Sequence, residues 1–396
     1  MHERLKASAA SYIDSIAQDL LRVSHDLHAH PELAFEEFHA CELLTTTLEA
    51  YDLSPRGKVY TLETAFECEV ARDGNGPVVA LLAEYDALPG IGHACGHNLI
   101  ATASLGAALA LAHVRDALPG TVRLLGTPAE EKGGGKEIMA RAGAFEGVDA
   151  SMMIHPFGRN MTSFPFIAYA QADVTYRGKA AHAAAAPHRG VNALDGLLLA
   201  YQGISNLRQH IRSTERIHGI VTDGGLAANI VPETAKGEFY VRAKDMDDLT
   251  ALKRRVSGCF EAGAAASGAA VEVVWGEVDY LDLRTNWPLA ERFQANAEAL
   301  GRTFFPLNEL SGNATGSTDM GNISHRVPSI HPLLAAAPHD VAIHTPEFAD
   351  YAGGELGDKA ALDGAKALAM TTIDFLCSEE LQKDVRRALE VSKGLA

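Results

Sequence analysis

The chain has 396 residues, of which 47% are hydrophobic and 21% charged, a composition typical of soluble globular proteins. This length exceeds what one ordinary hydrophobic core supports, so we expect two domains. The 34 Lys and Arg residues against 51 Asp and Glu give a net charge of −17, which argues against a nucleic-acid or anionic-membrane partner.

The five cysteines are scattered and odd in number, which does not suit a disulfide framework. The first residues lack the basic-then-apolar order of a secretory signal. No apolar run is long enough to cross a bilayer. We therefore expect a cytoplasmic protein.

Apolar periodicity predicts the elements of the first part of the chain. They are helices over 11–29, 34–51 and 99–114, a hairpin over 59–70, and a buried strand over 78–83. Asn98 is the expected N-cap of the third helix. His25, His28 and His30 form no obvious ligand face, and we interpret them as mostly surface residues or residues that support a site indirectly.

The loop after the strand at 78–83 carries His93, Cys95 and His97 at alternate positions. In an extended chain such side chains point the same way. Thiolate and imidazole together are the donors that zinc-like cations prefer. A lone histidine or cysteine is more often a packed or surface residue, so the interpretation as half of a metal site requires further ligands elsewhere.

Two more predicted strands end in ligand-type residues. The run 122–125 leads into GTPAEEKGGG, where Glu130 and Glu131 are adjacent. A pair of acids suits a division between metal binding and proton transfer, but a solvated acidic turn that opens a helix explains it equally well. The run 149–154 ends at His155. Because the carboxyl ends of parallel strands share one edge of a sheet, we expect these strand ends to meet.

Between residues 169 and 282 the pattern changes to strand, helix, strand, strand, helix, strand, the order of a split ferredoxin-like unit. This βαββαβ unit looks inserted, because the pattern of helices and strands found before residue 169 resumes at Trp287. We therefore predict a catalytic domain over 1–168 and 283–396 and a lid over 169–282. The fold class is α/β, with a mostly parallel sheet covered by helices on both faces.

Three polar residues stand out within the insert. His182, in GKAAHAAAAP, follows a strand end, Asn229 precedes the predicted strand over 235–243, and Arg242 lies within that strand. An arginine in an otherwise apolar strand needs a partner, which is either a structural carboxylate or a substrate anion. The residues alone favour the structural carboxylate.

The last section contains the loop SGNATGSTDMGN, a predicted strand over 329–334, and a helix over 356–376 that is expected to close the chain. His339 and His344 lie between the strand and the helix. Either histidine could complete the metal site.

Several sequence blocks follow one another along the chain. They are AEYDALPGIGHACGHNLIA, GTPAEEKGGGK, GKAAHAA, GVNALD, HGIVTDGG, ANIVP, GSTDMGN and IHTPEF. In this order they resemble the blocks of the aminoacylase/carboxypeptidase family of metallopeptidases, peptidase family M20. The resemblance covers about residues 20–375. It is greatest to the amidohydrolase branch, which includes p-aminobenzoyl-glutamate hydrolase, auxin-amide hydrolases and a β-alanyl dipeptidase group.

The resemblance implies a zinc-peptidase-like catalytic domain with a dinuclear centre of zinc or manganese. It implies hydrolysis of the amide bond of a small N-acyl or aminoacyl amino acid. The residues that match the family's ligands are Cys95, which would bridge the two ions, His97, Glu131, His155 and His344. Glu130 matches the general base, and Asp86 matches the acid that orients a histidine ligand.

In the lid, His182 resembles the residue that reaches across a homodimer to polarise the scissile carbonyl. Asn229 and Arg242 resemble the pair that binds a substrate carboxylate, and this replaces the structural interpretation of Arg242. Gly316, in the GSTD block, would face the substrate with its backbone. The resemblance thus implies a small amide substrate with a free carboxylate and a homodimer formed through the lid.

Two other functions stay open. One is a deacetylase or esterase that acts on another N-acyl substrate, and the other is a non-catalytic binding protein with the same fold. A lost ligand or base would mark the binding protein, and none is lost. The chain departs from the family pattern at Asn98, where auxin-amide hydrolases carry Asp, and at Ala181, where Ser is common.

Overall fold

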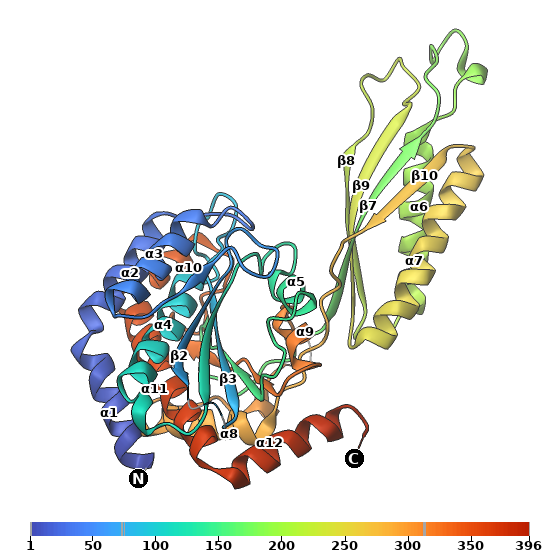
Figure 1. Cartoon of the computed structure of the whole chain (residues 1–396). Coiled ribbons are helices and arrows are strands. Elements are labelled where there is room, and N and C mark those ends of the chain that lie inside the picture. Colours follow the sequence, from blue (N-terminus) through green and yellow to red (C-terminus); the bar gives the residue numbers. More distant parts are fainter. Residues whose placement is uncertain (1, 73, 75, 312–313, 396) are drawn as a thin grey trace. The chain divides into compact units, whose positions relative to one another are not determined.

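The computed structural model describes residues 2–72, 74, 76–311 and 314–395. The chain divides into two compact units, one formed by Met1–Pro165 with Leu283–Ala396 and the other by Phe166–Asp282 (Figure 1). The predicted boundary between residues 168 and 169 therefore lies just inside the second unit. Among the described residues, no helix combines the length and the apolar character that a membrane span requires.

The first unit is built on a six-stranded sheet with the order β1-β2-β4-β3-β5-β11. Its strands are β1 (Arg56–Gly57), β2 (Phe66–Arg72), β3 (Val78–Glu84), β4 (Thr121–Thr127), β5 (Ala150–Met152) and β11 (Ser329–Ile330). The four strands from β4 to β11 are parallel, and β1 and β2 add antiparallel pairs at one edge. A separate parallel pair joins β6 (His155–Phe157) to β12 (Leu333–Ala335). The mostly parallel α/β prediction is confirmed.

Helices lie on both faces of this sheet. The helices of the first unit are α1 (His2–Ser15), α2 (Ala17–Ala29), α3 (Phe38–Ala50), α4 (His97–His113), α5 (Gly135–Arg141), α8 (Trp287–Ala299), α9 (Met320–Ser324), α10 (Pro346–Ala352), α11 (Glu355–Cys377) and α12 (Glu379–Ser392). Figure 1 shows α4 and α11 on one face and α5 and α9 on the other. Helices α4 and α11 approach closely because Gly106 leaves no side chain between them, and a Cβ at this position would lie 3.0 Å from Ala365.

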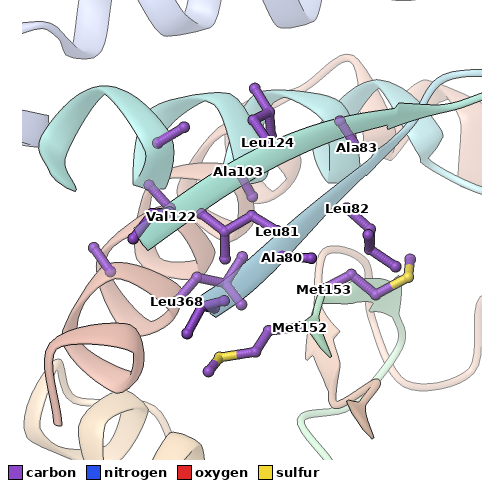
Figure 2. Packing of buried hydrophobic residues seen from close by; sticks show 14 of the residues in the cluster. Ala80, Leu81, Leu82, Ala83, Ala103, Val122, Leu124, Met152, Met153 and Leu368 are labelled. Carbon is purple, nitrogen blue, oxygen red and sulfur yellow. The ribbon is translucent and has the colours of Figure 1, made fainter. Parts of the chain in front are cut away.

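The core forms around β3, whose residues after Val78 are all buried. A strand that is covered on both faces needs an unbroken apolar run, which explains why this segment does not alternate. Figure 2 shows Leu81 and its neighbours in β3 beside Val122 of β4, Ala103 of α4 and Leu368 of α11. The packed core holds the carboxyl ends of β3 and β4 in fixed positions.

Several predicted helices in the first unit have different bounds. The helix predicted over 11–29 is two helices, because the chain turns at Ile16 between α1 and α2. The helix predicted over 34–51 begins only at Phe38, since Phe35 has a φ of +67°, outside the right-handed helical region. Helix α12 was not predicted, and the oxygen of Ser378 caps it by accepting the Leu381 amide. The helix at 356–376 therefore does not close the chain.

The shorter strands also differ from prediction. The hairpin expected over 59–70 lacks its first strand, because Tyr60 and Thr61 have positive φ values. Strand β2 pairs instead with the short strand β1, which precedes residue 59. Within the apolar run 149–154, only residues Ala150–Met152 form a strand, which is β5. The strand expected over 329–334 is split into β11 and β12, which pair with different partners.

The second unit has the predicted order strand, helix, strand, strand, helix, strand. Its elements are β7 (Ala168–Arg177), α6 (Ala193–Leu207), β8 (Arg216–Asp223), β9 (Thr234–Ala243), α7 (Met246–Ser267) and β10 (Ala270–Trp275). The antiparallel sheet has the order β10-β7-β9-β8, which is the ferredoxin-like arrangement. Alternate residues of β9, such as Phe239 and Val241, are buried in the core that the sheet forms with α6 and α7. The role of this unit as a lid stays a prediction.

Replacing Leu81 with Ala should lower the free energy of unfolding of the first unit by about 2–5 kcal/mol, because this fully buried side chain would leave a cavity. Chemical denaturation followed by circular dichroism measures the change. Leu356→Ala is the matched control, because that leucine is 45% exposed and its truncation should cost less than about 1 kcal/mol. Equal losses in the two variants would contradict the packing described for β3.

Candidate metal centre

The carboxyl ends of β3 and β4 bring the predicted acidic residues together. Strand β3 ends at Glu84, which pairs in register with Thr127 at the end of β4. Asp86 follows the first strand, and Glu130 and Glu131 follow the second. The Glu131 amide donates a hydrogen bond of 2.9 Å to Oδ2 of Asp86. The two strand-end loops are therefore joined directly, as the shared edge of a parallel sheet predicts.

Cys95 and His97 reach this edge through a sharp turn of the chain. Gly96 has a φ of +79°, a left-handed conformation that favours glycine, and it is the N-cap of α4. A Cβ at Gly96 would lie 2.9 Å from Pro156. His97 is thus the first residue of a helix, and the prediction that His93, Cys95 and His97 point the same way in extended chain is wrong.

His93 does not belong to the cluster that Cys95 and His97 join. Its ring lies beside that of His28, with the centroids 6.4 Å apart. Burial lowers the pKa of His93 to about 3, so it is a neutral core residue.

Asn98 was expected to cap α4, but it lies inside that helix. Its Nδ2 donates to the Ala352 carbonyl at 3.0 Å.

Five residues from distant parts of the chain converge around one sulfur atom. They are Cys95, His97, Glu131, His155 and His344. The Sγ atom of Cys95 lies 3.4 Å from Nε2 of His155 and 3.3 Å from Nε2 of His344. The donor atoms form two triads in which every pair lies within 4.8 Å, and both triads contain Cys95. One triad adds His97 and His155, and the other adds Glu131 and His344.

The ligand-type histidines are held by fixed hydrogen bonds. Nδ1 of His97 lies 3.1 Å from Oδ1 of Asp86, and Nδ1 of His155 donates to the Pro156 carbonyl at 2.7 Å. These bonds direct Nε2 of each ring toward the cluster, as is usual for histidines that bind metals. Asp86 thus has the geometry expected of the residue that orients a histidine.

His344, rather than His339, joins the cluster. The backbone amide of His344 donates to the Ala94 carbonyl at 2.8 Å, and its φ of +64° turns the side chain toward Cys95. His339 is exposed, and its ring lies 3.4 Å from the carboxylate of Asp340. Of the two histidines that the residues alone left open, the structure brings His344 and not His339 into the cluster.

Burial and charge perturb the protonation of the cluster. Burial raises the pKa of the Cys95 thiol well above its usual range, and the neighbouring Glu131 adds to the effect. Burial also lowers the pKa of His155 well below its ordinary value. For His97, burial acts to lower the pKa, but Cys95 and Asp86 outweigh it and raise the pKa. A thiol and a carboxylate that are buried together ionise readily only beside a cation.

The donors fit a metal centre. Oε1 of Glu131 and Nε2 of His97 are buried without a hydrogen-bond partner among the described residues. Such groups are costly inside a protein unless something else pairs with them. Thiolate, imidazole and carboxylate are the ligands of zinc and related cations, which would relieve that cost.

Glu130 lies beside this cluster in a pocket of further acids. Its carboxylate is grouped with those of Glu84 and Asp319 and, on the other side, with His97 and Glu131. Burial raises the pKa of Glu130 well above its ordinary value, and the surrounding negative charges raise it further. Glu130 therefore holds a proton more strongly than an exposed glutamate does.

A buried lysine balances part of this charge. Lys136 is fully buried, and its Nζ lies 2.7 Å from Oδ1 of Asp319 and in direct contact with Glu84. Sequence reasoning missed Lys136 and Asp319, although both stand in the blocks GTPAEEKGGGK and GSTDMGN. The only signal was a charged residue among glycines and small residues, which also occurs at surfaces.

Glu37 is a second residue that sequence reasoning missed. Its buried Oε1 accepts the Ala129 amide at 2.8 Å and the Phe35 amide at 3.0 Å, and its Oε2 accepts the Thr64 hydroxyl at 2.8 Å. Ala129 has a φ of +61°, which is unusual for alanine. Glu37 therefore fixes the turn that immediately precedes Glu130, and no local pattern distinguishes it from the other acids of its segment.

Within the second unit, His182 and Asn229 lie side by side. The Ala183 amide donates to the Asn229 carbonyl at 3.0 Å. Nδ1 of His182 accepts the amides of Ala184 and Ala185 at 3.3 and 3.2 Å. The neutral ring therefore carries its proton on Nε2, where it can donate to a ligand.

Arg242 lies at the opposite end of β9 from these two residues. It pairs in register with Tyr169, and its guanidinium lies 4.8 Å above the ring of that tyrosine. At about 3.3 Å per residue, the strand from Thr234 to Arg242 spans roughly 25 Å. The structure therefore does not bring Asn229 and Arg242 of one chain together.

Gly316 lies in the first unit, where its amide donates to the Pro165 carbonyl at 3.4 Å. The contact of Gly316 with a substrate stays a prediction.

Comparison with known proteins identifies the family of this chain and several relatives. The family model described as peptidase family M20/M25/M40 matches residues 80–367. The chain is 40% identical to the Xaa-Arg dipeptidase of Mus musculus, over 97% of this chain and 92% of that protein. It is 31% identical to a subunit of the p-aminobenzoyl-glutamate hydrolase of Escherichia coli strain K12, over 93% of this chain and 92% of that one.

Solved structures show the same fold. The dinuclear metal binding peptidase of the M20 family from Bacillus subtilis superimposes with a TM-score of 0.69 at 22% identity, over 92% of this chain and 99% of that one. The family model spans well over half of the chain, and the resemblance inferred from the sequence blocks is confirmed. The chain belongs to peptidase family M20/M25/M40 and is a hydrolase of amide or peptide bonds.

Proposed function

We propose that this hydrolase uses two metal ions to cleave a dipeptide or an N-acyl amino acid that carries a free carboxylate. The observation that carries the proposal is the pair of donor triads that share Cys95, with Glu130 beside them. The names of two relatives support the substrate class, because one denotes a dipeptide that ends in arginine and the other an amide of glutamate.

Each triad would hold one ion, and the sulfur of Cys95 would bridge them. We propose zinc as the ion, with manganese as the alternative, because one thiolate and three imidazoles are softer donors than manganese prefers. When bound, the two ions would activate a water molecule and polarise the scissile carbonyl.

Glu130 is the general base in this proposal. Its carboxylate accepts the proton of the attacking water and then delivers that proton to the nitrogen of the leaving amine. The position of Glu130 beside the donor atoms of His97 and Glu131 supports this role. Asp86 supports the reaction indirectly by orienting His97 through a contact of 3.1 Å.

The second unit would act as the lid and as the dimer interface. The proton on Nε2 of His182 suits it to stabilise the oxyanion that forms from the carbonyl. Asn229 and Arg242 would bind the substrate carboxylate, and Gly316 would face the substrate with its backbone. Because Asn229 and Arg242 lie at opposite ends of β9, they can contact one substrate only if they come from different copies of the chain. The proposal therefore requires a homodimer.

Glu130→Gln should lower kcat by roughly 10²–10⁴-fold, because the variant cannot accept the proton of water. Turnover is measured with Xaa-Arg dipeptides and p-aminobenzoyl-glutamate, and metal content by elemental analysis. The metal content should not change, since Glu130 is not a proposed ligand. Glu355→Gln, an exposed acid at the start of α11, is the control. Full turnover by Glu130→Gln would remove this residue from the role of base.

Chelation should abolish turnover, and zinc or manganese should restore it. Cys95→Ala should weaken the binding of both ions, since its sulfur belongs to both triads, whereas His344→Ala should mainly weaken one. Equilibrium dialysis with elemental analysis counts the bound ions, and Cys41→Ala serves as the cysteine control. A Cys95→Ala protein that retains both ions as tightly as the parent would refute the bridging role.

Two inactive variants should restore activity when they are mixed. A chain with His182→Ala keeps its own Glu130, and a chain with Glu130→Gln supplies an intact His182. After unfolding and refolding together in equal amounts, mixed dimers should recover about a quarter of the parent activity, since half of the dimers contain one complete site of two. Activity no higher than that of the separate variants would show that His182 does not act across a dimer.

A further inference from the structure

A second group of metal-type donors shares no residue with the cluster around Cys95. Asp26 lies in the last turn of α2, His30 directly follows that helix, and His39 lies in the first turn of α3. Oδ1 of Asp26 is 3.3 Å from Nδ1 of His30 and 2.5 Å from Nε2 of His39. All three donor atoms lie within 4.8 Å of one another.

We propose that Asp26, His30 and His39 form an additional binding site for a divalent transition metal of the zinc type. Two imidazoles and one carboxylate are a frequent three-residue ligand set for zinc, and solvent would complete the tetrahedron. This site would be independent of the proposed dinuclear centre.

The distances suit such an ion. Metal bonds of 2.0–2.1 Å in a tetrahedron place neighbouring ligand atoms about 3.3 Å apart. The separation between Asp26 and His30 already has this value, and that between Asp26 and His39 needs to open by less than about 1 Å. The side chains of Asp26, His30 and His39 are 38%, 58% and 42% exposed, so they can adjust and an ion can reach them from solvent.

Charge also favours a bound cation. The ring centroids of His30 and His39 lie 4.8 Å apart, and both rings lie beside the single Asp26 carboxylate. A cation held between the rings would pair with that carboxylate. Glu32 adds a second nearby negative charge, and its two oxygens accept the amides of His39 and Ala40 at 2.9 Å. Nδ1 of His30 would exchange its 2.9 Å bond to the Asp26 carbonyl for the metal.

An ion at this position would tie the end of α2 to the start of α3. The segment between them supports the strand-end loops of the candidate metal centre. The Glu32 carbonyl accepts the Ala87 amide at 2.8 Å, and Glu37 accepts the Ala129 amide at 2.8 Å. The additional site would therefore stabilise the segment that positions the turn before Glu130.

The test counts zinc ions on the full chain by equilibrium dialysis against zinc buffered in the micromolar range. His30→Ala combined with His39→Ala should lose one zinc ion per chain relative to the parent, whatever number the buried centre retains. His188→Ala combined with His210→Ala removes two exposed histidines of the second unit and should lose none. Asp26→Asn keeps the shape of the side chain but removes its charge, and it should weaken the binding of that same ion.

The proposal is overturned if the double variant at His30 and His39 binds as many zinc ions as the parent. It is also overturned if the control variant loses an equal amount, because binding would then be a general property of exposed histidines. Circular dichroism of each variant checks that it is folded. If the double variant does not fold, Asp26→Asn decides the matter alone, and unchanged zinc affinity in that variant rejects the site.

Discussion

The structure depends on an excess of buried negative charge at one edge of a parallel sheet. The carboxylates that gather there are those of Glu84, Asp86, Glu130, Glu131 and Asp319. Lys136 is the ammonium group buried with them, and it contacts Glu84 and Asp319. Buried carboxylates without compensation are among the most costly groups in a protein. This excess of buried negative charge favours cations at this edge, and we propose that the two donor triads around Cys95 hold them.

The backbone around the centre supports this interpretation. Gly96, Ala129 and His344 all have positive φ values, and each lies next to or within the cluster. For Ala129 and His344 this conformation is strained, and such strain persists where the surrounding structure holds it and is common at functional sites. Glu37 holds Ala129, and the Ala94 carbonyl holds His344. The core around β3 and these hydrogen bonds thus hold the donors close together.

Much of the architecture could be predicted from the sequence, because strand ends carry a clear signal. The unbroken apolar run of β3 and the positions of Glu130 and His155 after their strands predicted the shared edge. The βαββαβ order of the second unit was also readable, since its strands and helices have distinct periods. The family blocks then selected His344 over His339, which the residues alone could not do.

What the sequence missed depends on contacts between distant residues. His93 resembles a ligand by spacing, but the chain here is turned rather than extended, and the His93 ring packs beside that of His28. Asn98 resembles a helix cap, yet its partner is the carbonyl of Ala352, far along the chain. The importance of Lys136 and Glu37 follows only from their burial among groups contributed by other elements. Within one chain, the length of β9 separates Asn229 from Arg242, and no local sequence pattern showed this.

The most direct test of the central claim is anomalous diffraction at the zinc edge from crystals of the full chain. The account predicts two zinc ions at the carboxyl ends of β3 and β4, both about 2.3 Å from the sulfur of Cys95. One ion should contact His97 and His155, and the other Glu131 and His344. An absence of zinc at Cys95, or ions bound there without these ligands, would contradict the account.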